Sequence, residues 1–361
     1  MNYEKYMKKC IRLAKKADGK TSPNPLVGCV VLDKNGKEIA NGYHKLYGEA
    51  HAEADALSKV GDEAIGGTLI VSLEPCSHFG KTPPCADLII KKGIKKLVIA
   101  MQDPNPLVAG EGVEKCKKAG IEVVENVLHD EAMKLNEVFV KNMTQKTCFV
   151  ALKTATTLDG KIATKTGSSK WITSEKARNE VQKIRNRYDA ILTTSSTVIN
   201  DNPSMTCRMK NGKNPVRIIL DRELKTDFSS KIYNFSGEKI YVVVDESTSD
   251  SQFSLVPKHI SVIKCPSYNL KLDLKFLLKK LFEFGIRSVL VESGGKLNGE
   301  LVSLGLVDKI YQFIAPKILG DKKGINAFEG RGIKDINDSL SYNLESVTSF
   351  APDLLVVLVK N

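Results

Sequence analysis

Long apolar runs are missing from this sequence. No stretch approaches the roughly 18 consecutive apolar residues of a membrane-spanning helix. The N-terminal residues mix lysine with apolar side chains, unlike the apolar segment of a signal peptide. Low-complexity tracts and repeats are also missing, and 42% hydrophobic against 27% charged residues is typical of a folded protein. We therefore expect a folded cytoplasmic protein with no membrane partner.

Basic clusters are missing as well, although the net charge is +12. Residues 1–147 hold 22 Lys and Arg against 19 Asp and Glu, a net of +3, and the remaining residues hold 32 against 23, a net of +9. The excess is scattered over the C-terminal half. A scattered excess favours a phosphorylated small ligand over a nucleic-acid backbone, so we expect no nucleic-acid partner.

Cysteine is too sparse for a disulfide framework, with eight in 361 residues. In a reducing compartment, paired cysteines more often bind metal or act in catalysis, which draws attention to Cys76 and Cys85. The length exceeds the roughly 250–300 residues at which one core divides, so two domains are expected. The polar stretch 142–147 is the expected junction, between domains 1–146 and 147–361.

Strand and helix patterns alternate in both halves, which predicts an α/β fold containing parallel strands. In the first half, apolar periodicity and turn residues predict strands at 26–32, up to 43, 68–73, 96–101 and 122–127, and helices at 3–17, 51–60, from 84, 113–119 and 131–141. In the second half they predict strands at 149–152, 190–194, 216–221, 240–245, 260–264, 288–292, 310–314 and 354–359, and helices at 174–188, 272–284 and about 296–305.

Three residues at element ends form a candidate metal centre. His51 begins a predicted helix, Cys76 follows a strand, and Cys85 begins another helix. One imidazole and two thiolates suit catalytic zinc, which takes three protein ligands and keeps one position open for water. Two cysteines nine positions apart are by themselves more often buried core thiols. The three residues in this order nevertheless favour zinc.

Glu53 follows His51 in the same helical turn and is the candidate general acid/base. It would take a proton from water and deliver it to a leaving amine. The signature of zinc deaminases is His-x-Glu followed by Pro-Cys-x-x-Cys. Here eight residues separate Cys76 from Cys85, which argues against the cytidine and nucleic-acid deaminases.

Four polar residues on neighbouring loops are candidate substrate contacts: Asn24, His44, His78 and Lys81. Taken singly, each is most simply a solvated loop residue. The Pro-Asn-Pro segment would place the Asn24 amide near the mouth of the site, where it would read the edge of a pyrimidine. Lys81 would meet a phosphate.

The sequence resembles the bifunctional riboflavin-biosynthesis deaminase–reductases, over nearly the whole chain and in the family's order. The stretch 74–85, with its long spacing between Pro-Cys and Pro-Pro-Cys, is the most specific match. The other matching segments are 22–28, 51–53, 103–106, 158–161, 169–173, 201–203, 291–295 and 315–317.

The resemblance implies a cytidine-deaminase-like three-layer αβα domain followed by a dihydrofolate-reductase-like α/β domain. It implies zinc-dependent hydrolytic deamination of a diaminopyrimidinone that carries a phosphoribosylamino group, and then NADPH-dependent reduction of the ribosyl group to ribityl. By the same resemblance, His51, Cys76 and Cys85 bind one Zn²⁺ per chain, Glu53 is catalytic, and the four loop residues contact the deaminase substrate. It also implies a homo-oligomer assembled through the reductase half.

For the reductase half, the resemblance assigns two sets of residues. The cofactor contacts are Ala155, Ile162, Trp171, Thr197, Asp201, Gly294, Gly295, Lys296, Leu297, Asn298, Gly299 and Glu300. The substrate contacts are Lys153, Ser169, Arg185, Met205, Arg208 and Glu292.

Residue chemistry supports part of this assignment independently. A strand ending at Glu292, a turn at Gly294-Gly295 and a following helix would present backbone amides to a diphosphate. This is not the Gly-x-Gly-x-x-Gly fingerprint, and a strand followed by two glycines is by itself usually a plain turn. Arg185 and Arg208 would clamp a phosphate, although an isolated arginine is more often part of a surface ion pair. Reduction of a sugar needs a hydride donor, which no side chain supplies, so a nicotinamide is required.

Two other function classes stay open at this point. A nucleic-acid base deaminase would use the same zinc chemistry, but it predicts clustered basic and aromatic residues near the metal segments. A non-catalytic zinc-stabilised binding module would leave Glu53 without a purpose. A deaminase with a decayed second half is a third, weaker alternative.

Overall fold

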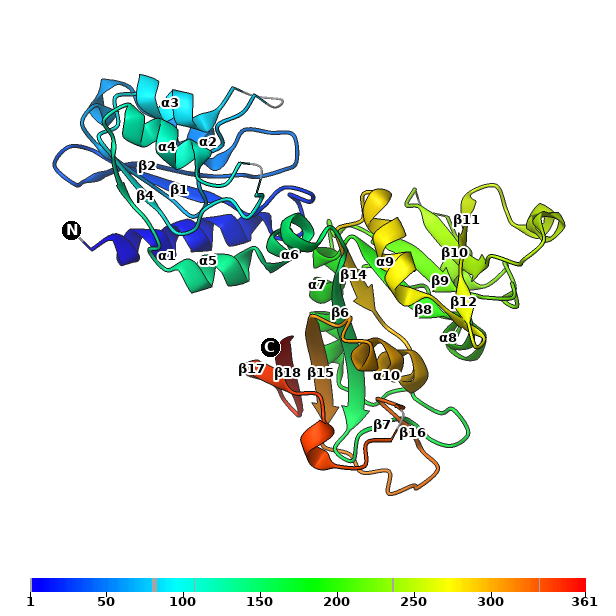
Figure 1. Ribbon diagram of the computed structural model, residues 1–361. Coiled ribbons are helices and arrows are strands. Elements are labelled where there is room, and N and C mark those ends of the chain that lie inside the picture. The colour runs from blue at the N-terminus through cyan, green and yellow to red at the C-terminus, as the bar shows by residue number, and fades with distance from the viewer. Residues whose placement is uncertain (1, 80–82, 107, 236, 331) are drawn as a thin grey trace. The chain divides into compact units, whose positions relative to one another are not determined.

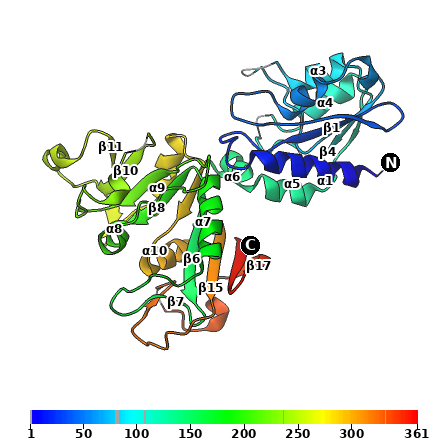
Figure 2. The same cartoon turned by 180° about the vertical axis from the view of Figure 1, so that it is seen from behind.

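The computed structural model describes residues 2–79, 83–106, 108–235, 237–330 and 332–361. The chain divides into two compact units, Met1–Lys146 and Thr147–Asn361. Both units contain mixed sheets covered by helices (Figures 1 and 2), so the expected α/β fold is confirmed. No helix among the described residues is long and apolar enough to cross a membrane.

The first unit is built on a five-stranded sheet of order β2-β1-β3-β4-β5. Strand β1 is antiparallel to β2 and β3, whereas β3, β4 and β5 are mutually parallel. Helices α2, α3 and α4 lie on one face, and α1 and α5 lie on the other (Figure 1), which gives three layers. The bounds are β1 Gly28–Leu32, β2 Glu38–Tyr43, β3 Thr68–Val71, β4 Lys96–Ile99, β5 Glu122–Val124, α1 Tyr3–Ala14, α2 Ala52–Leu57, α3 Cys85–Lys91, α4 Glu111–Lys118, α5 His129–Leu135 and α6 Glu137–Gln145, with 3-10 turns Lys15–Ala17 and Asp62–Ala64.

Two glycines let helices approach this sheet closely. A Cβ on Gly28 of β1 would lie 2.0 Å from the carbonyl oxygen of Cys10 in α1. A Cβ on Gly42 of β2 would lie 2.6 Å from the carbonyl oxygen of Ala52 in α2. Because α2 carries the candidate acid/base, Gly42 in β2 sets the distance between that residue's helix and the sheet.

The second unit contains a nine-stranded sheet of order β11-β10-β9-β8-β14-β6-β15-β18-β17. The seven strands from β11 to β15 are parallel, and β18 and β17 add an antiparallel hairpin. Helices α9 and α10 cover the face turned to the viewer in Figure 1, and α7 covers the face seen in Figure 2. The bounds are β6 Phe149–Thr157, β7 Lys161–Ala163, α7 Glu175–Arg187, β8 Ala190–Thr194, α8 Ser195–Asp201, β9 Val216–Leu220, β10 Ile240–Asp245, β11 Ile260–Cys265, β12 Ser267–Tyr268, β13 Lys271–Leu272, α9 Leu274–Glu283, β14 Ser288–Val291, α10 Gly295–Ser303, β15 Lys309–Ala315, β16 Ile325–Asn326, β17 Tyr342–Phe350 and β18 Asp353–Lys360, with 3-10 turns Lys231–Tyr233, Asp250–Leu255 and Ile336–Asp338.

The single helix predicted at 131–141 was wrong, because the segment forms two helices, α5 and α6, that meet at Asn136. The buried Asn136 side chain accepts a hydrogen bond from the Leu26 N–H (2.8 Å) and donates one to the Leu26 carbonyl (3.1 Å). Helix α6 then continues to Gln145, through most of the stretch expected as a junction. The helix α8 and the strands β7, β12, β13, β16 and β17 were not predicted.

Candidate active sites in the two units

The three predicted zinc ligands of the first unit converge. Their ligand atoms lie within 4.8 Å of one another, with His51 Nδ1 3.6 Å from Cys76 Sγ and 3.4 Å from Cys85 Sγ. Zinc bonds of about 2.0–2.1 Å to nitrogen and 2.3 Å to sulfur, at a tetrahedral angle, give a nitrogen–sulfur distance of about 3.5 Å. The side chains therefore fit a zinc ion without rearrangement.

Local structure accounts for this convergence. His51 is the N-cap residue of α2 with an extended backbone, and Cys85 is the first residue of α3. Cys76 follows β3, and its sulfur accepts a hydrogen bond from the Cys85 backbone N–H at 3.3 Å. Hydrogen bonds from the Cys85 thiol and from His51 lower the pKa of Cys76 to about 4. Cys76 thus favours the thiolate form that metals bind, whereas the hydrogen bond with Cys76 and burial raise the pKa of Cys85.

Glu53 lies in the first turn of α2, with only 3% of its surface exposed. Burial raises its pKa to about 7, and the charge of Cys76 acts in the same direction. Its carboxyl group interacts with Cys85. A buried carboxyl beside a metal centre is placed to hold or release a proton near neutral pH.

The structure brings two of the four predicted substrate contacts together. His44 is buried, with its ring centre 5.6 Å from that of His51. Its Nδ1 lies 3.0 Å from the Ala50 carbonyl oxygen, and its Nε2 lies 3.1 Å from Asn24 Nδ2. Burial lowers the pKa of His44, so the neutral ring donates to the carbonyl and accepts from Asn24. The Asn24 amide oxygen is then not used in this contact.

The other two predicted substrate contacts are His78 and Lys81. His78 is exposed, and its charge acts on Asp103. Lys81 lies outside the described residues. The involvement of all four residues in substrate binding stays a prediction.

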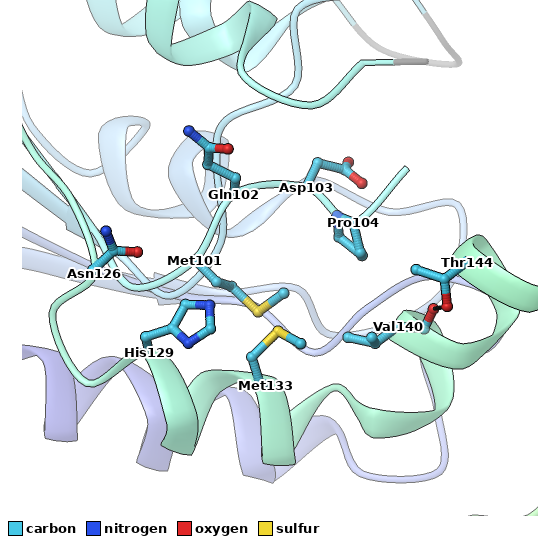
Figure 3. Close-up of a pocket in the computed structure, with 9 residues that line it drawn as sticks. All are labelled: Met101, Gln102, Asp103, Pro104, Asn126, His129, Met133, Val140 and Thr144. Atoms are coloured by element: carbon cyan, nitrogen blue, oxygen red, sulfur yellow. Dashed lines mark hydrogen bonds between the residues drawn. The ribbon is translucent and has the colours of Figure 1, made fainter. Parts of the chain in front are cut away.

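Asp103 is a residue that sequence reasoning noted only as part of a matching segment. It is half-buried after β4, and burial raises its pKa, as do the charges of Glu74 and Cys76. A pocket of about 330 Å³ adjoins this segment, lined by Met101, Gln102, Asp103, Pro104, Asn126, His129, Met133, Val140 and Thr144. In Figure 3 the side chains of Met101 and Met133 point toward one another across it. The Asp-Pro-Asn-Pro turn after a buried strand was the available signal.

In the second unit, three predicted substrate residues form one buried charge cluster. Arg185 from α7 donates to both carboxylate oxygens of Glu292, from Nε at 2.7 Å and from a terminal nitrogen at 3.1 Å. Lys153 Nζ on β6 lies 3.4 Å from the same carboxylate. Arg185 also donates to the Thr206 carbonyl and contacts the sulfur of Met205. Burial alone would raise the pKa of Glu292, but the charges of Arg185 and Lys153 outweigh it and hold the pKa at about 2.

This cluster lies where the order of the strand connections changes direction. From β8 the chain continues to its neighbour β9 toward one edge of the sheet, whereas from β14 it crosses over β6 to β15 toward the other edge. In open α/β sheets, ligands bind at the carboxyl ends of strands at such a switch point. Glu292 directly follows β14, and the predicted cofactor segment 294–300 forms the N-cap and first turns of α10. Gly294 provides no side-chain cap, so the amides at this end are available to an anion.

The remaining predicted residues lie on loops and short elements of this unit. Thr197 and Asp201 lie on α8, Ala155 on β6 and Ile162 on β7. Trp171 is 61% exposed, with the Arg178 guanidinium 4.4 Å from its ring centre, so a core role is excluded. Ser169 is half-buried, and the exposed Arg208 contacts α7 through its backbone N–H, which donates to Gln182. The roles of these residues stay predictions.

Comparisons with known proteins find a different family model in each of the two units. Residues 1–101 match the cytidine and deoxycytidylate deaminase zinc-binding region, and residues 148–356 match the RibD C-terminal domain. The riboflavin biosynthesis protein RibD of Actinobacillus pleuropneumoniae is 43% identical over 97% of this chain and 93% of its own length. That of Aquifex aeolicus is 44% identical over 97% and 96%. A crystal structure from Thermotoga maritima, described as a diaminohydroxyphosphoribosylaminopyrimidine deaminase/5-amino-6-(5-phosphoribosylamino)uracil reductase, has a TM-score of 0.88 at 41% identity and covers 99% of both chains.

Proposed function

The chain belongs to the RibD family of riboflavin biosynthesis proteins, and from this premise we propose that it converts a diaminohydroxyphosphoribosylaminopyrimidine in two successive steps. The first step is hydrolytic deamination to 5-amino-6-(5-phosphoribosylamino)uracil, and the second is reduction of the ribosyl group of that product. Its cofactors are Zn²⁺ and NADPH. We assign the deaminase to residues 1–146 and the reductase to residues 147–361.

The convergence of His51, Cys76 and Cys85 beside the buried Glu53 carries the deaminase proposal. Bound zinc lowers the pKa of a water molecule and so supplies a nucleophile at neutral pH. Glu53 accepts the proton of that water and returns it to the departing amine. A structural zinc site would have no use for a buried carboxyl at this position, which argues against a non-catalytic module.

Recognition of the pyrimidine is assigned to the pair formed by Asn24 and His44. Because Asn24 Nδ2 is 3.1 Å from His44 Nε2, the amide is oriented with its oxygen available. That oxygen accepts a hydrogen bond from an amino group on the ring edge. His78 and Lys81 are assigned to the substrate phosphate.

In the reductase, NADPH supplies the hydride, and the protein supplies position and charge. The amides at the start of α10 bind the cofactor diphosphate. Glu292 holds the Lys153 ammonium at the carboxyl end of the sheet, where it donates a hydrogen bond to the sugar oxygen that gains negative charge. Arg185 is fixed by the same carboxylate and faces the substrate phosphate.

The decisive test is to supply purified protein with the diaminopyrimidine phosphate and to follow ammonia release and NADPH oxidation separately. Both signals are expected, and NADPH oxidation should begin only after ammonia appears. Ammonia release without oxidation would leave the deaminase and remove the reductase. Activity on an RNA or DNA strand but not on the free nucleotide would favour the alternative of a nucleic-acid deaminase.

We also propose that the chain forms a homo-oligomer, a dimer or larger. The outer strand of the second sheet supports this proposal. Strand β17 lies at the sheet edge with Leu344 63% and Val347 54% exposed, and an edge strand with exposed apolar side chains invites pairing. We place this assembly in the cytoplasm, because the thiol ligands need a reducing compartment. Light scattering of the Val347→Lys variant tests the interface: the mass should fall, and an unchanged mass would exclude β17.

A further inference from the structure

Glu74 is a buried carboxylate that the two-step scheme leaves without a role. Only 5% of its surface is exposed. One carboxylate oxygen accepts hydrogen bonds from the backbone N–H groups of Asp103 (3.0 Å) and Gly110 (2.9 Å), and the other accepts from Val113 (3.1 Å). Within the part of the chain that the structure describes, no lysine or arginine forms an ion pair with it. Among the residues that the structure describes, backbone amides therefore satisfy this carboxylate.

These three bonds tie together segments that come from different elements. Asp103 belongs to the segment after β4, whereas Gly110 and Val113 are the N-cap and first turn of α4. Gly110 has no side chain to cap α4, so the carboxylate serves as its cap. On the same side, Gly112 lies against the next residue of the Glu74 segment, because a Cβ there would be 1.9 Å from the Pro75 carbonyl oxygen.

The segment held in this way lies near the zinc centre, because Glu74 is two positions before Cys76. The carboxyl group of Asp103 interacts electrostatically with both His78 and Cys76. Its chain neighbours, Met101 and Pro104, line the pocket shown in Figure 3. Asp103 thus lies near the metal ligands, and its backbone N–H donates a hydrogen bond to Glu74.

We propose that Glu74 is a positioning residue of the deaminase: it holds the Asp103 segment and the start of α4 against the segment that carries Cys76, and so sets the position of Asp103 relative to the pyrimidine phosphate substrate. This inference rests on the proposed function and adds a specific determinant to it. Glu74 does not touch the substrate. It acts through Asp103, and it should control substrate affinity more than the chemical step.

The test compares Glu74→Gln and Glu74→Ala with Glu125→Gln in the full-length protein. Gln keeps one carbonyl oxygen and turns an amide N–H against the remaining donor, whereas Ala removes every acceptor. Glu125 is the matched control, because its carboxylate accepts from Gln102, next to Asp103, on the exposed side of the same segment. Each variant is assayed for bound zinc, for kcat and KM of ammonia release, and for NADPH oxidation with the deaminated intermediate supplied.

For Glu74→Gln we expect kcat/KM of deamination to fall about 10- to 100-fold, the range for residues that orient contacting groups. The loss should lie mainly in KM, with one zinc per chain and unchanged reductase turnover, and Ala should be worse than Gln. Loss of zinc, a fall confined to kcat, or kinetics equal to those of Glu125→Gln would overturn the inference. If the wild-type protein releases no ammonia, it is the proposed function that fails.

Discussion

The zinc centre and the reductase cluster are assembled in different ways. The zinc ligands span 35 positions of sequence. His51 and Cys85 lie at helix starts, Cys76 lies in the segment after β3, and the Cys85 backbone N–H donates to the Cys76 sulfur. The reductase cluster joins Lys153, Arg185 and Glu292, which span 140 positions of sequence. Lys153 and Glu292 come together only because β6 and β14 pair as neighbours in the parallel sheet. The first site is therefore encoded by local spacing, and the second by topology. The two sites should respond differently to substitution and to pH.

The largest effect is expected from Glu53→Gln. The amide cannot shuttle a proton, so ammonia release should fall about 10²- to 10⁴-fold. Zinc content and NADPH oxidation with the supplied intermediate should not change, and the exposed Glu131→Gln serves as control. A variant with wild-type ammonia release and bound zinc would refute the role of Glu53.

In the second unit, Glu292→Gln should destabilise the fold as well as the activity. Removing one partner of a buried ion pair leaves uncompensated charges on Arg185 and Lys153, which costs about 3–5 kcal/mol of unfolding free energy. Denaturant unfolding can be followed at Trp171, the single tryptophan, which lies in this unit. The control is Glu283→Gln, which breaks an exposed pair with Lys280 and should cost less than about 1 kcal/mol. Equal losses of unfolding free energy in the two variants would show that the buried cluster stabilises the fold no more than an exposed ion pair does.

The same carboxylate makes the stability of the second unit depend on pH. Its pKa is about 2 in the folded protein, against an ordinary value of 4.5, so its contribution is complete above about pH 4.5 and is lost as the pH falls toward 2. The contribution amounts to about 3 kcal/mol. The difference in unfolding free energy between wild type and Glu292→Gln should therefore be large at pH 6 and shrink by pH 3. A difference that does not vary with pH would contradict this assignment.

The smallest effect is expected from Asn24→Ala. Losing one hydrogen bond to the substrate costs about 0.5–1.5 kcal/mol, a rise in the deaminase KM of about 2- to 10-fold. The kcat should change less, and the reductase should be unaffected. Asn35→Ala, in an exposed turn of the same unit, is the control. An unchanged KM would remove Asn24 from the recognition site.

The sequence predicted most of the zinc centre, because His51, Cys76 and Cys85 mark element ends that apolar periodicity and turn residues reveal. It could not predict the break at Asn136, which depends on a hydrogen-bond partner 110 positions away. Strand β17 was missed because its mostly exposed, polar sequence lacks a buried face and is ordered by pairing with β18. The cluster at Glu292 was reached by family resemblance, since its partners lie too far apart along the chain for spacing to reveal them.

The bonds between Asn136 and Leu26 bear on how the deaminase could be isolated. They connect Asn136, between α5 and α6, to Leu26, two positions after Asn24, and so link the last helices of the first unit to a segment near its N-terminus. A fragment cut after β5 would release the backbone next to Asn24, the proposed substrate contact, while keeping every predicted zinc ligand. Such a fragment would carry metal yet bind substrate poorly, so an excised deaminase should extend at least through α6.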